Sequence, residues 1–188
     1  IRLMAEKKEY CFEDLITIVD ILRSEKGCPW DREQSHKSIR KDFIEETYEV
    51  IEAIDTENSE LLREELGDVL LQVVFHSDIA KANGNFSIDD VCTDICKKLI
   101  VRHPHVFGDV KADDSATVLR NWEQMKQMEH KKEARHSALD GVPAALPALL
   151  KAQRTQEKAA RVGFDWKDAK GPLEKIKEEI DDKEEDNS

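Results

Sequence analysis

Long apolar stretches are missing from this 188-residue sequence, and their absence excludes several classes of protein. No segment reaches the roughly 18 consecutive apolar residues that a membrane-spanning helix requires, so we expect no association with a membrane. The first twenty residues mix charged and apolar side chains and show no signal-peptide core. Glycine and proline are scarce, at 7 and 5 residues, and no alternating pattern typical of β-strands is present. We therefore expect an all-α protein.

The sequence also lacks cysteine pairs of the CxxC type and an excess of positive charge. Cys11, Cys28, Cys92 and Cys96 form no CxxC pair and no zinc-like spacing, so reduced thiols in a cytoplasmic protein are the simplest account. We expect Cys92 and Cys96, one helical turn apart, to be buried. The chain has 29 Lys and Arg against 41 Asp and Glu, a net charge of −12, which argues against general binding to nucleic acid. An acidic protein can still bind a phosphate-rich small molecule if metal ions bridge the two.

Apolar residues recur at helical spacing along most of the chain. Helices are expected over residues 12–26, 38–55, 60–82, 88–102, 115–135 and 148–161. Asn58 or Ser59 is expected to cap the third helix and Ser87 the fourth. "KGCPWDREQSHKS" is expected to be a turn, and the tail from Leu173 at most a short charged helix. Short connections between long amphipathic helices favour an antiparallel helix bundle.

Acidic residues follow one side of two neighbouring predicted helices. The polar stripe of the helix at 60–82, whose second half is otherwise apolar, holds Glu65, Asp68, Gln72 and His76. The helix at 38–55 carries Glu46 and Glu49 at the same spacing. Two carboxylates three positions apart share a helix side and repel each other unless a cation lies between them. Hard divalent cations such as Mg²⁺ prefer oxygen ligands, so these acids predict a metal site.

Two other interpretations of the acidic residues remain open. A solvated helix face is the ordinary explanation for any single ExxE, although the apolar surroundings of Glu65 and Asp68 disfavour it there. A carboxylate-bridged iron protein uses the same bundle, but such sites also take Glu-x-x-His pairs. Neither acidic pair continues into a histidine three residues later, which disfavours iron.

Three blocks of the sequence are informative together: "GCPWDREQSHKSIRKDFIEETYEVIEAID", "LREELGDVLLQVVFHSDIA" and "KKLIVRHPHVFGDV". In this order they resemble the MazG nucleoside triphosphate pyrophosphohydrolases, and the resemblance covers roughly residues 12 to 165. It implies an all-α NTP pyrophosphatase fold that works as a homodimer or higher oligomer. It also implies hydrolysis of a nucleoside triphosphate to monophosphate and pyrophosphate with Mg²⁺, for which Mn²⁺ is a possible substitute. Broad base tolerance is expected, in a role in nucleotide-pool housekeeping.

The resemblance also assigns residues to roles. The metal-binding ExxE of the family falls on Glu46 and Glu49 and its ExxD on Glu65 and Asp68, with Glu45 as a further metal ligand or water-orienting base. Its substrate-binding residues fall on Lys98, Arg102, Trp122 and Lys126. Lys98 and Arg102 would neutralise polyphosphate charge, and Trp122 could stack on a base. The alternatives are a surface charge at Arg102 and a plain core residue at Trp122.

The resemblance suggests three segments. Residues 1–11 are an N-terminal extension, 12–135 the MazG-like catalytic domain, and 136–188 a C-terminal helical segment with an acidic tail. Within the last, "GFDWKDAKGPLEKIKEEI" resembles the start of a second such domain, which ends before another ELGD block. The competing hypothesis is a non-catalytic nucleotide-binding, dimerisation or regulatory module that has kept the fold.

Overall fold

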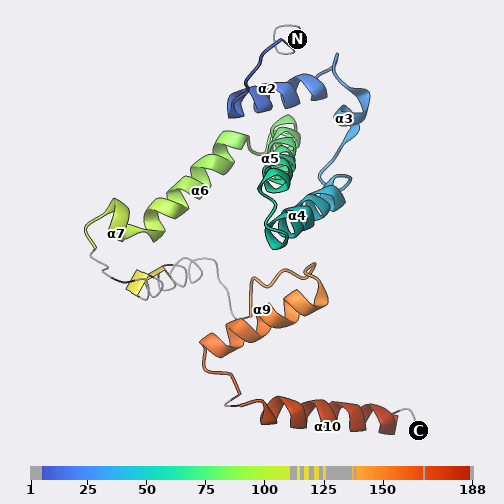
Figure 1. Cartoon of the computed structure of the whole chain (residues 1–188), viewed down its shortest axis with the longest axis vertical. Coiled ribbons are helices and arrows are strands. Elements are labelled where there is room, and N and C mark those ends of the chain that lie inside the picture. Colours follow the sequence, from blue (N-terminus) through green and yellow to red (C-terminus); the bar gives the residue numbers. More distant parts are fainter. Residues whose placement is uncertain are drawn as a thin grey trace. The chain divides into compact units, whose positions relative to one another are not determined.

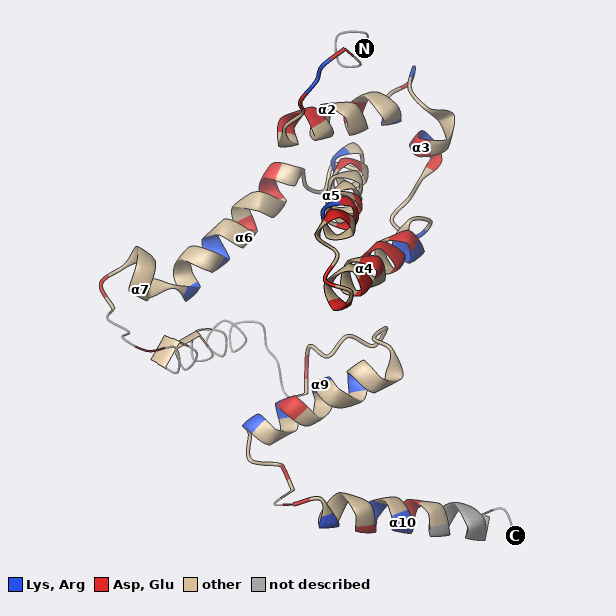
Figure 2. Ribbon diagram, in the orientation of Figure 1, with Lys and Arg blue, Asp and Glu red and all other residues tan. Residues whose placement is uncertain are grey.

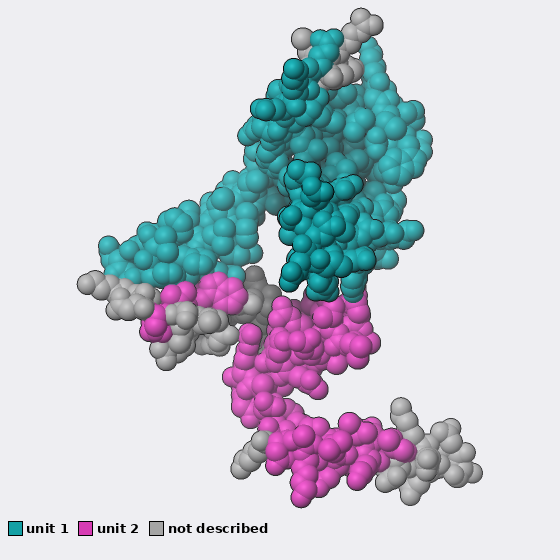
Figure 3. Space-filling view, viewed as in Figure 1, with its two compact units in different colours: residues 1–110 teal, residues 111–188 magenta. Residues whose placement is uncertain are grey.

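The computed structural model shows a helical chain (Figure 1). It describes residues 6–110, 114, 117, 118, 121, 122, 125, 137, 139–166 and 168–186, with only the backbone for 181–186. Every regular element in these residues is a helix, as the sequence predicted, and none of these helices is both long and apolar enough to cross a membrane. The chain divides into two compact units, residues 1–110 and 111–188 (Figure 3). Each unit is described by itself.

The first helix of the first unit, α2 (Phe12–Arg23), ends in a turn that only glycine can form. A Cβ atom on Gly27 would lie 2.2 Å from the carbonyl oxygens of Ile21 and Leu22, so any side chain there would clash with backbone. The chain then enters the short helix α3 (Pro29–Glu33), where the sequence predicted only a turn. Pro29 begins this helix, because proline lacks an N–H that the first helical position does not need.

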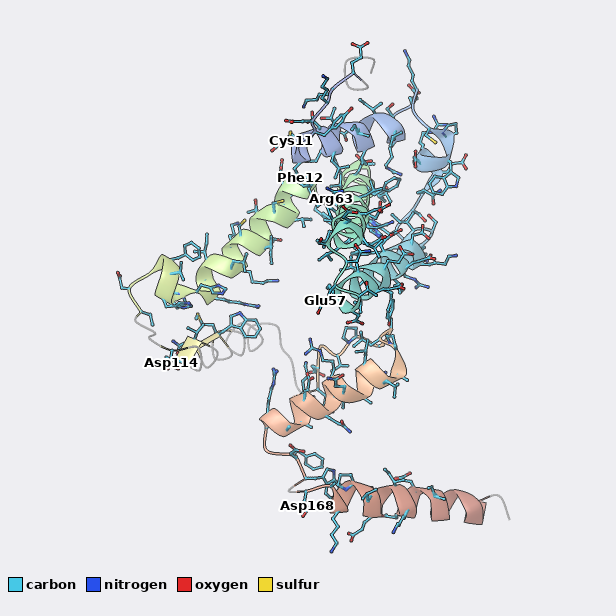
Figure 4. The ribbon with its side chains drawn as sticks, in the orientation of Figure 1. Cys11, Phe12, Glu57, Arg63, Asp114 and Asp168 are labelled. Carbon is cyan, nitrogen blue, oxygen red and sulfur yellow. The ribbon has the colours of Figure 1, made fainter. Side chains whose placement is uncertain are left out.

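The long helices α4 (Arg40–Asp55) and α5 (Ser59–Ala82) form a helical hairpin. Asn58 caps α5, its side-chain oxygen accepting a bond from the Leu61 N–H at 3.1 Å, which confirms one of the two predicted caps. At the end of α4 the N–H groups of Glu57 and Asn58 donate to the carbonyls of Ile54 and Ala53. This bonding pattern is a Schellman motif, and it holds Glu57 at φ 52°, a left-handed conformation that favours glycine. Glu57 is labelled in Figure 4.

The core of the first unit lies where α5 packs against α2. Its buried cluster contains Val19, Ile39, Val74, Phe75 and Ile79. Ile39, which precedes α4, is 4% exposed and thereby anchors the start of that helix. The apolar part of α5 is less covered at its start than the sequence predicted, since Leu66 is 51% and Leu70 40% exposed. The hairpin therefore keeps apolar surface that this unit does not bury.

Helix α6 (Ile88–Arg102) packs on α5 and leads into α7 (Pro104–Phe107). Ser87 caps α6 as predicted: its hydroxyl accepts from the Asp90 N–H, and the Asp90 carboxylate accepts from the Ser87 N–H. Cys92 and Cys96 are both exposed, so the prediction that they are buried is wrong for this chain taken singly. Their helix face carries an apolar stripe, and nothing among residues 6–110 covers it.

The second unit contains α9 (Ala148–Arg161) and α10 (Lys170–Asp186). The predicted helix at 148–161 is confirmed. The length of the helix in the tail was underestimated, because α10 has 17 residues, with Leu173, Ile176 and Ile180 along one side. Most of the helix predicted at 115–135, and the predicted domain boundary between residues 135 and 136, lie outside the described residues.

Candidate metal and substrate site

Three carboxylates of the α4–α5 hairpin converge. Each of Glu46, Glu49 and Glu65 has a carboxylate oxygen within 4.8 Å of those of the other two. Glu46 and Glu49 share a side of α4 because they lie three positions apart, and the hairpin places Glu65 of α5 beside them. Figure 2 shows acidic residues along both helices. This is the one group of three or more potential metal ligands of the His, Cys, Asp and Glu types among the described residues.

The electrostatics of the cluster are unfavourable without a cation. Glu65 is only 9% exposed, and burial followed by the charge of Glu49 raises the pKa of its carboxyl group. The pKa of Glu46 is raised as well, by burial first and then by the charges of Asp68 and Glu49. Each shift means that the folded protein disfavours the ionised form of that carboxyl group. A hard divalent cation bound by these oxygens would remove that penalty, so the donor set fits Mg²⁺ or a similar ion.

Asp68 lies beside this cluster rather than within it. Its half-buried side chain follows Glu65 by one turn of α5, and its charge acts on Glu46 and Glu65. It is not one of the three residues whose oxygens converge. One turn further, Gln72 has a buried Oε1 with no hydrogen-bond partner among the described residues. The predicted polar stripe of α5 therefore exists, with its acids next to the α4 carboxylates.

The other predicted site residues are placed on separate elements. Glu45 is exposed on α4, next to Glu46 in sequence. Lys98 and Arg102 lie one turn apart in the second half of α6, Lys98 exposed and Arg102 half-buried. Trp122 belongs to the second unit, where its side chain is half-buried, and Lys126 lies outside the described residues. Convergence of these basic and aromatic side chains with the carboxylates stays a prediction.

One contact beside the polar stripe was not predicted. His76, the last member of the stripe, meets His36 from the connection between α3 and α4, with their Nδ1 atoms 2.8 Å apart. The two residues are 40 positions apart, and no local pattern links them. Only the packing of the α4–α5 hairpin brings them together.

Comparison with known proteins finds a family profile that matches the segment containing this hairpin. The profile of the MazG nucleotide pyrophosphohydrolase domain matches residues 34–107, which span α4, α5, α6 and α7. The chain is 50% identical over 169 residues to the nucleoside triphosphate pyrophosphohydrolase/pyrophosphatase MazG of Thermotoga maritima, covering 90% of this chain and 64% of that protein. It is 49% identical over 169 residues to the nucleoside triphosphate pyrophosphohydrolase of Escherichia coli K12, covering 89% and 64%.

A more distant relative is the nucleoside triphosphate pyrophosphohydrolase of Mycobacterium tuberculosis. It is 39% identical over 155 residues, covering 80% of this chain and 45% of that protein. The chain thus spans less than two thirds of the length of these curated relatives.

Proposed function

The chain belongs to the MazG family, whose nucleotide pyrophosphohydrolase domain it carries at residues 34–107, and we propose that it hydrolyses nucleoside triphosphates to nucleoside monophosphate and pyrophosphate. The observation that carries this proposal is the convergence of Glu46, Glu49 and Glu65 on the α4–α5 hairpin, inside the matched segment. Relatives about half identical over most of this chain are named for that activity.

Glu46, Glu49, Glu65 and Asp68 are the residues we propose to hold Mg²⁺, with Mn²⁺ as a substitute. The raised carboxyl pKa values of Glu46 and Glu65 support this, because burial and then repulsion among the acids disfavour their ionised forms, and a bound cation would offset both costs. When bound, the metal supplies positive charge for the phosphate oxygens and lowers the pKa of bound water.

The remaining steps belong to the side chains of the chain itself. Glu45, adjacent to Glu46 and exposed, is the proposed base that orients the attacking water and accepts its proton. Lys98 and Arg102, one helical turn apart on α6, pair with phosphate oxygens and offset charge on the departing pyrophosphate. Trp122 stacks on the base and Lys126 reaches a phosphate. A stacking contact has little preference among bases, so broad base tolerance is part of the proposal.

A homodimer is the proposed assembly. On α4, Ile44, Tyr48 and Ile51 form an apolar stripe on the side away from Glu46, and each is between 45% and 54% exposed. Leu66 and Leu70 add exposed apolar surface on α5. Contiguous apolar surface of this kind marks an interaction site, and a second copy presents the same surface.

The location we propose is the cytoplasm, in keeping with four free cysteines.

The test is a panel of nucleoside triphosphates, including dUTP and oxidised or deaminated purines, incubated with and without Mg²⁺. Pyrophosphate and orthophosphate are measured separately. We expect Mg²⁺-dependent pyrophosphate release, abolished by Asp68→Asn, which removes one charge with little change in volume. Release of orthophosphate instead would refute the assignment. Binding of a non-hydrolysable triphosphate without turnover of any member of the panel would favour a regulatory module.

A further inference from the structure

The contact between His36 and His76 is a hydrogen bond between two imidazole edges. The Nδ1 atoms are 2.8 Å apart, the ring planes differ by 6°, and the ring centroids are 5.1 Å apart. That centroid distance is too long for rings in face-to-face contact. It equals the distance between the two Nδ1 atoms plus the distance from each Nδ1 to the centre of its own ring. The rings therefore meet edge to edge. One Nδ1–H donates to the lone pair of the other Nδ1, so at least one ring is neutral.

This bond connects the segment that starts α4 to the second half of α5. His36 lies in a short connection tied by Ser35 and Ser38, in which the N–H of each donates to the hydroxyl of the other. Ile39, which follows Ser38 and directly precedes α4, is buried in the core. The position of His36 is therefore linked to the start of α4. His76 lies on the same stripe of α5 as Glu65 and Asp68. The pair thus joins the two helices that carry the candidate metal ligands.

A second contact at the same place strengthens this connection. The ring of Phe43, in the first turn of α4, tilts against that of His76 with centroids 5.8 Å apart. Phe43 precedes Glu46 by three residues, so it lies on the adjacent turn of the same helix. A movement of His76 away from His36 and Phe43 would change the angle between α4 and α5, and with it the separation of the carboxylates.

The surroundings of His76 favour the neutral form of its ring. Burial, followed by the charge of His36, lowers the pKa of His76. His36 is the one ionisable group whose charge acts on His76 among the described residues, while α4 presents the uncharged ring of Phe43 and α5 the uncharged Gln72 one turn before. If both rings took a proton, two N–H groups and two positive charges would face each other across 2.8 Å with no acceptor between them.

We propose that His36 and His76 are positioning residues, whose shared hydrogen bond holds α4 and α5 at the separation that the carboxylate cluster requires and is released when both rings are protonated. Neither residue contacts the metal or the substrate in this role. They act through Glu46 and Glu49 on one helix and Glu65 and Asp68 on the other. The measurements of Mg²⁺ affinity rest on the metal site proposed above and the measurement of KM on the proposed hydrolysis, so the two parts can fail separately.

The experiment compares three forms of the full chain. In His36→Asn/His76→Asn the side-chain amides replace the two Nδ1 atoms by groups that still hydrogen-bond but do not titrate. His76→Ala removes the bond. His103→Asn is the matched control, because His103 bonds within its own segment, Nδ1 to the Leu99 carbonyl at 2.7 Å, and is not part of the pair. Far-UV circular dichroism checks the fold, and Mg²⁺ affinity is read from metal-dependent stabilisation between pH 5.5 and 8.

We expect His76→Ala to bind Mg²⁺ about tenfold more weakly than the parent at pH 7.5, as is usual when a group that orients metal ligands is lost. Acidification should weaken Mg²⁺ binding in the parent and the control more than in the double Asn variant. Protonation of the carboxylates occurs in all of them, so the difference isolates the pair. Proton NMR of the ring protons should show the resonances of His36 and His76 changing as the hydrogen bond between them is lost.

Three results would overturn the proposal. The first is an Ala variant with Mg²⁺ affinity and pH dependence within twofold of the parent, which would make the bond a passive contact. The second is an effect on KM alone with unchanged Mg²⁺ affinity, which would place the histidines at the substrate. The third is a double Asn variant with the acid sensitivity of the parent, which remains decisive even if His76→Ala does not fold. Normal Mg²⁺ results without any hydrolysis would leave the pair in place and refute the proposed function instead.

Discussion

Arg23 on α2 and Asp78 on α5 form an ion pair between residues 55 positions apart, with Nε 2.5 Å from a carboxylate oxygen. Both side chains are largely buried, at 8% and 15% exposure. The guanidinium of Arg23 also lies 5.0 Å from the centre of the Phe75 ring and donates to the carbonyl of Asp31. A single side chain thereby holds α2, α3 and α5 together, and the position of the segment before α4 depends on it.

Replacing Arg23 by Met should lower the free energy of unfolding by about 3 kcal/mol, because it leaves the Asp78 carboxylate buried without its partner. Replacing both residues, by Arg23→Met with Asp78→Leu, should recover most of that loss, since no unpaired charge remains. Urea denaturation measures both. The matched control is Arg154→Met, in the exposed pair with Glu157, which should change stability by less than about 0.5 kcal/mol.

The stability of the metal-free protein should fall as pH rises through the raised pKa values of Glu46 and Glu65. A carboxyl group with a raised folded-state pKa contributes stability that is fully present below its ordinary value of 4.5 and is lost above the folded value. Glu65→Gln should therefore raise the melting temperature of the metal-free protein at pH 7. Mg²⁺ should raise that of the parent and have much less effect on the variant.

Glu52→Gln is the control for this experiment, because Glu52 is exposed on α4 and outside the cluster. It should melt like the parent with and without Mg²⁺. An equal response of Glu65→Gln and Glu52→Gln would show that the acids form an ordinary solvated helix face.

Glu57→Gly should stabilise the protein by about 0.5–1 kcal/mol, since Glu57 occupies a left-handed conformation that glycine adopts without a steric penalty. The ends of α5 and α9 form the same bonding pattern with Gly84 at φ 70° and Gly163 at φ 84°. Gly84→Ala is thus the reciprocal variant and should destabilise by a similar or larger amount. Thermal melts decide both, and pyrophosphate release should stay at the parental rate in Glu57→Gly.

Ile51→Lys should dissociate the proposed dimer, because it places a charge on the exposed apolar stripe of α4. Light scattering after size-exclusion chromatography should give the dimer mass for the parent and the monomer mass for the variant at micromolar concentration. Leu149→Lys, at an 86% exposed site on α9, serves as the control and should keep the parental mass. A parent that is strictly monomeric would refute the dimer.

Much of the helical layout could be predicted from local sequence. α9 begins and ends where the apolar spacing placed it, and Asn58 and Ser87 are caps because their oxygens accept backbone N–H groups that the helix leaves unbonded. α3 was missed since Pro29 ends one helix as readily as it begins another. α10 was underestimated because its charged residues outnumber the apolar ones that repeat along one side.

The candidate site was predictable only in part. Helical spacing places Glu46 with Glu49, and Glu65 with Asp68, but it does not say which of them converge across the hairpin. The pairing of His36 with His76 depends on tertiary packing and has no local pattern. The exposure of Cys92 and Cys96 could not be predicted either, since an apolar stripe on α6 is equally consistent with a buried face and with an uncovered one.

The α4–α5 hairpin also has a consequence for how the chain folds. Glu46, Glu49, Glu65 and Asp68 all lie within residues 46–68, whereas the Arg23–Asp78 contact closes a much longer loop. Contacts between residues close in sequence form sooner on average, because less chain entropy is lost in closing them. We therefore expect the carboxylates to be brought together early, so that their repulsion opposes the first step of assembly. A divalent cation that binds them would then speed folding as well as stabilise the product, so the ion would act as a nucleating partner for the chain.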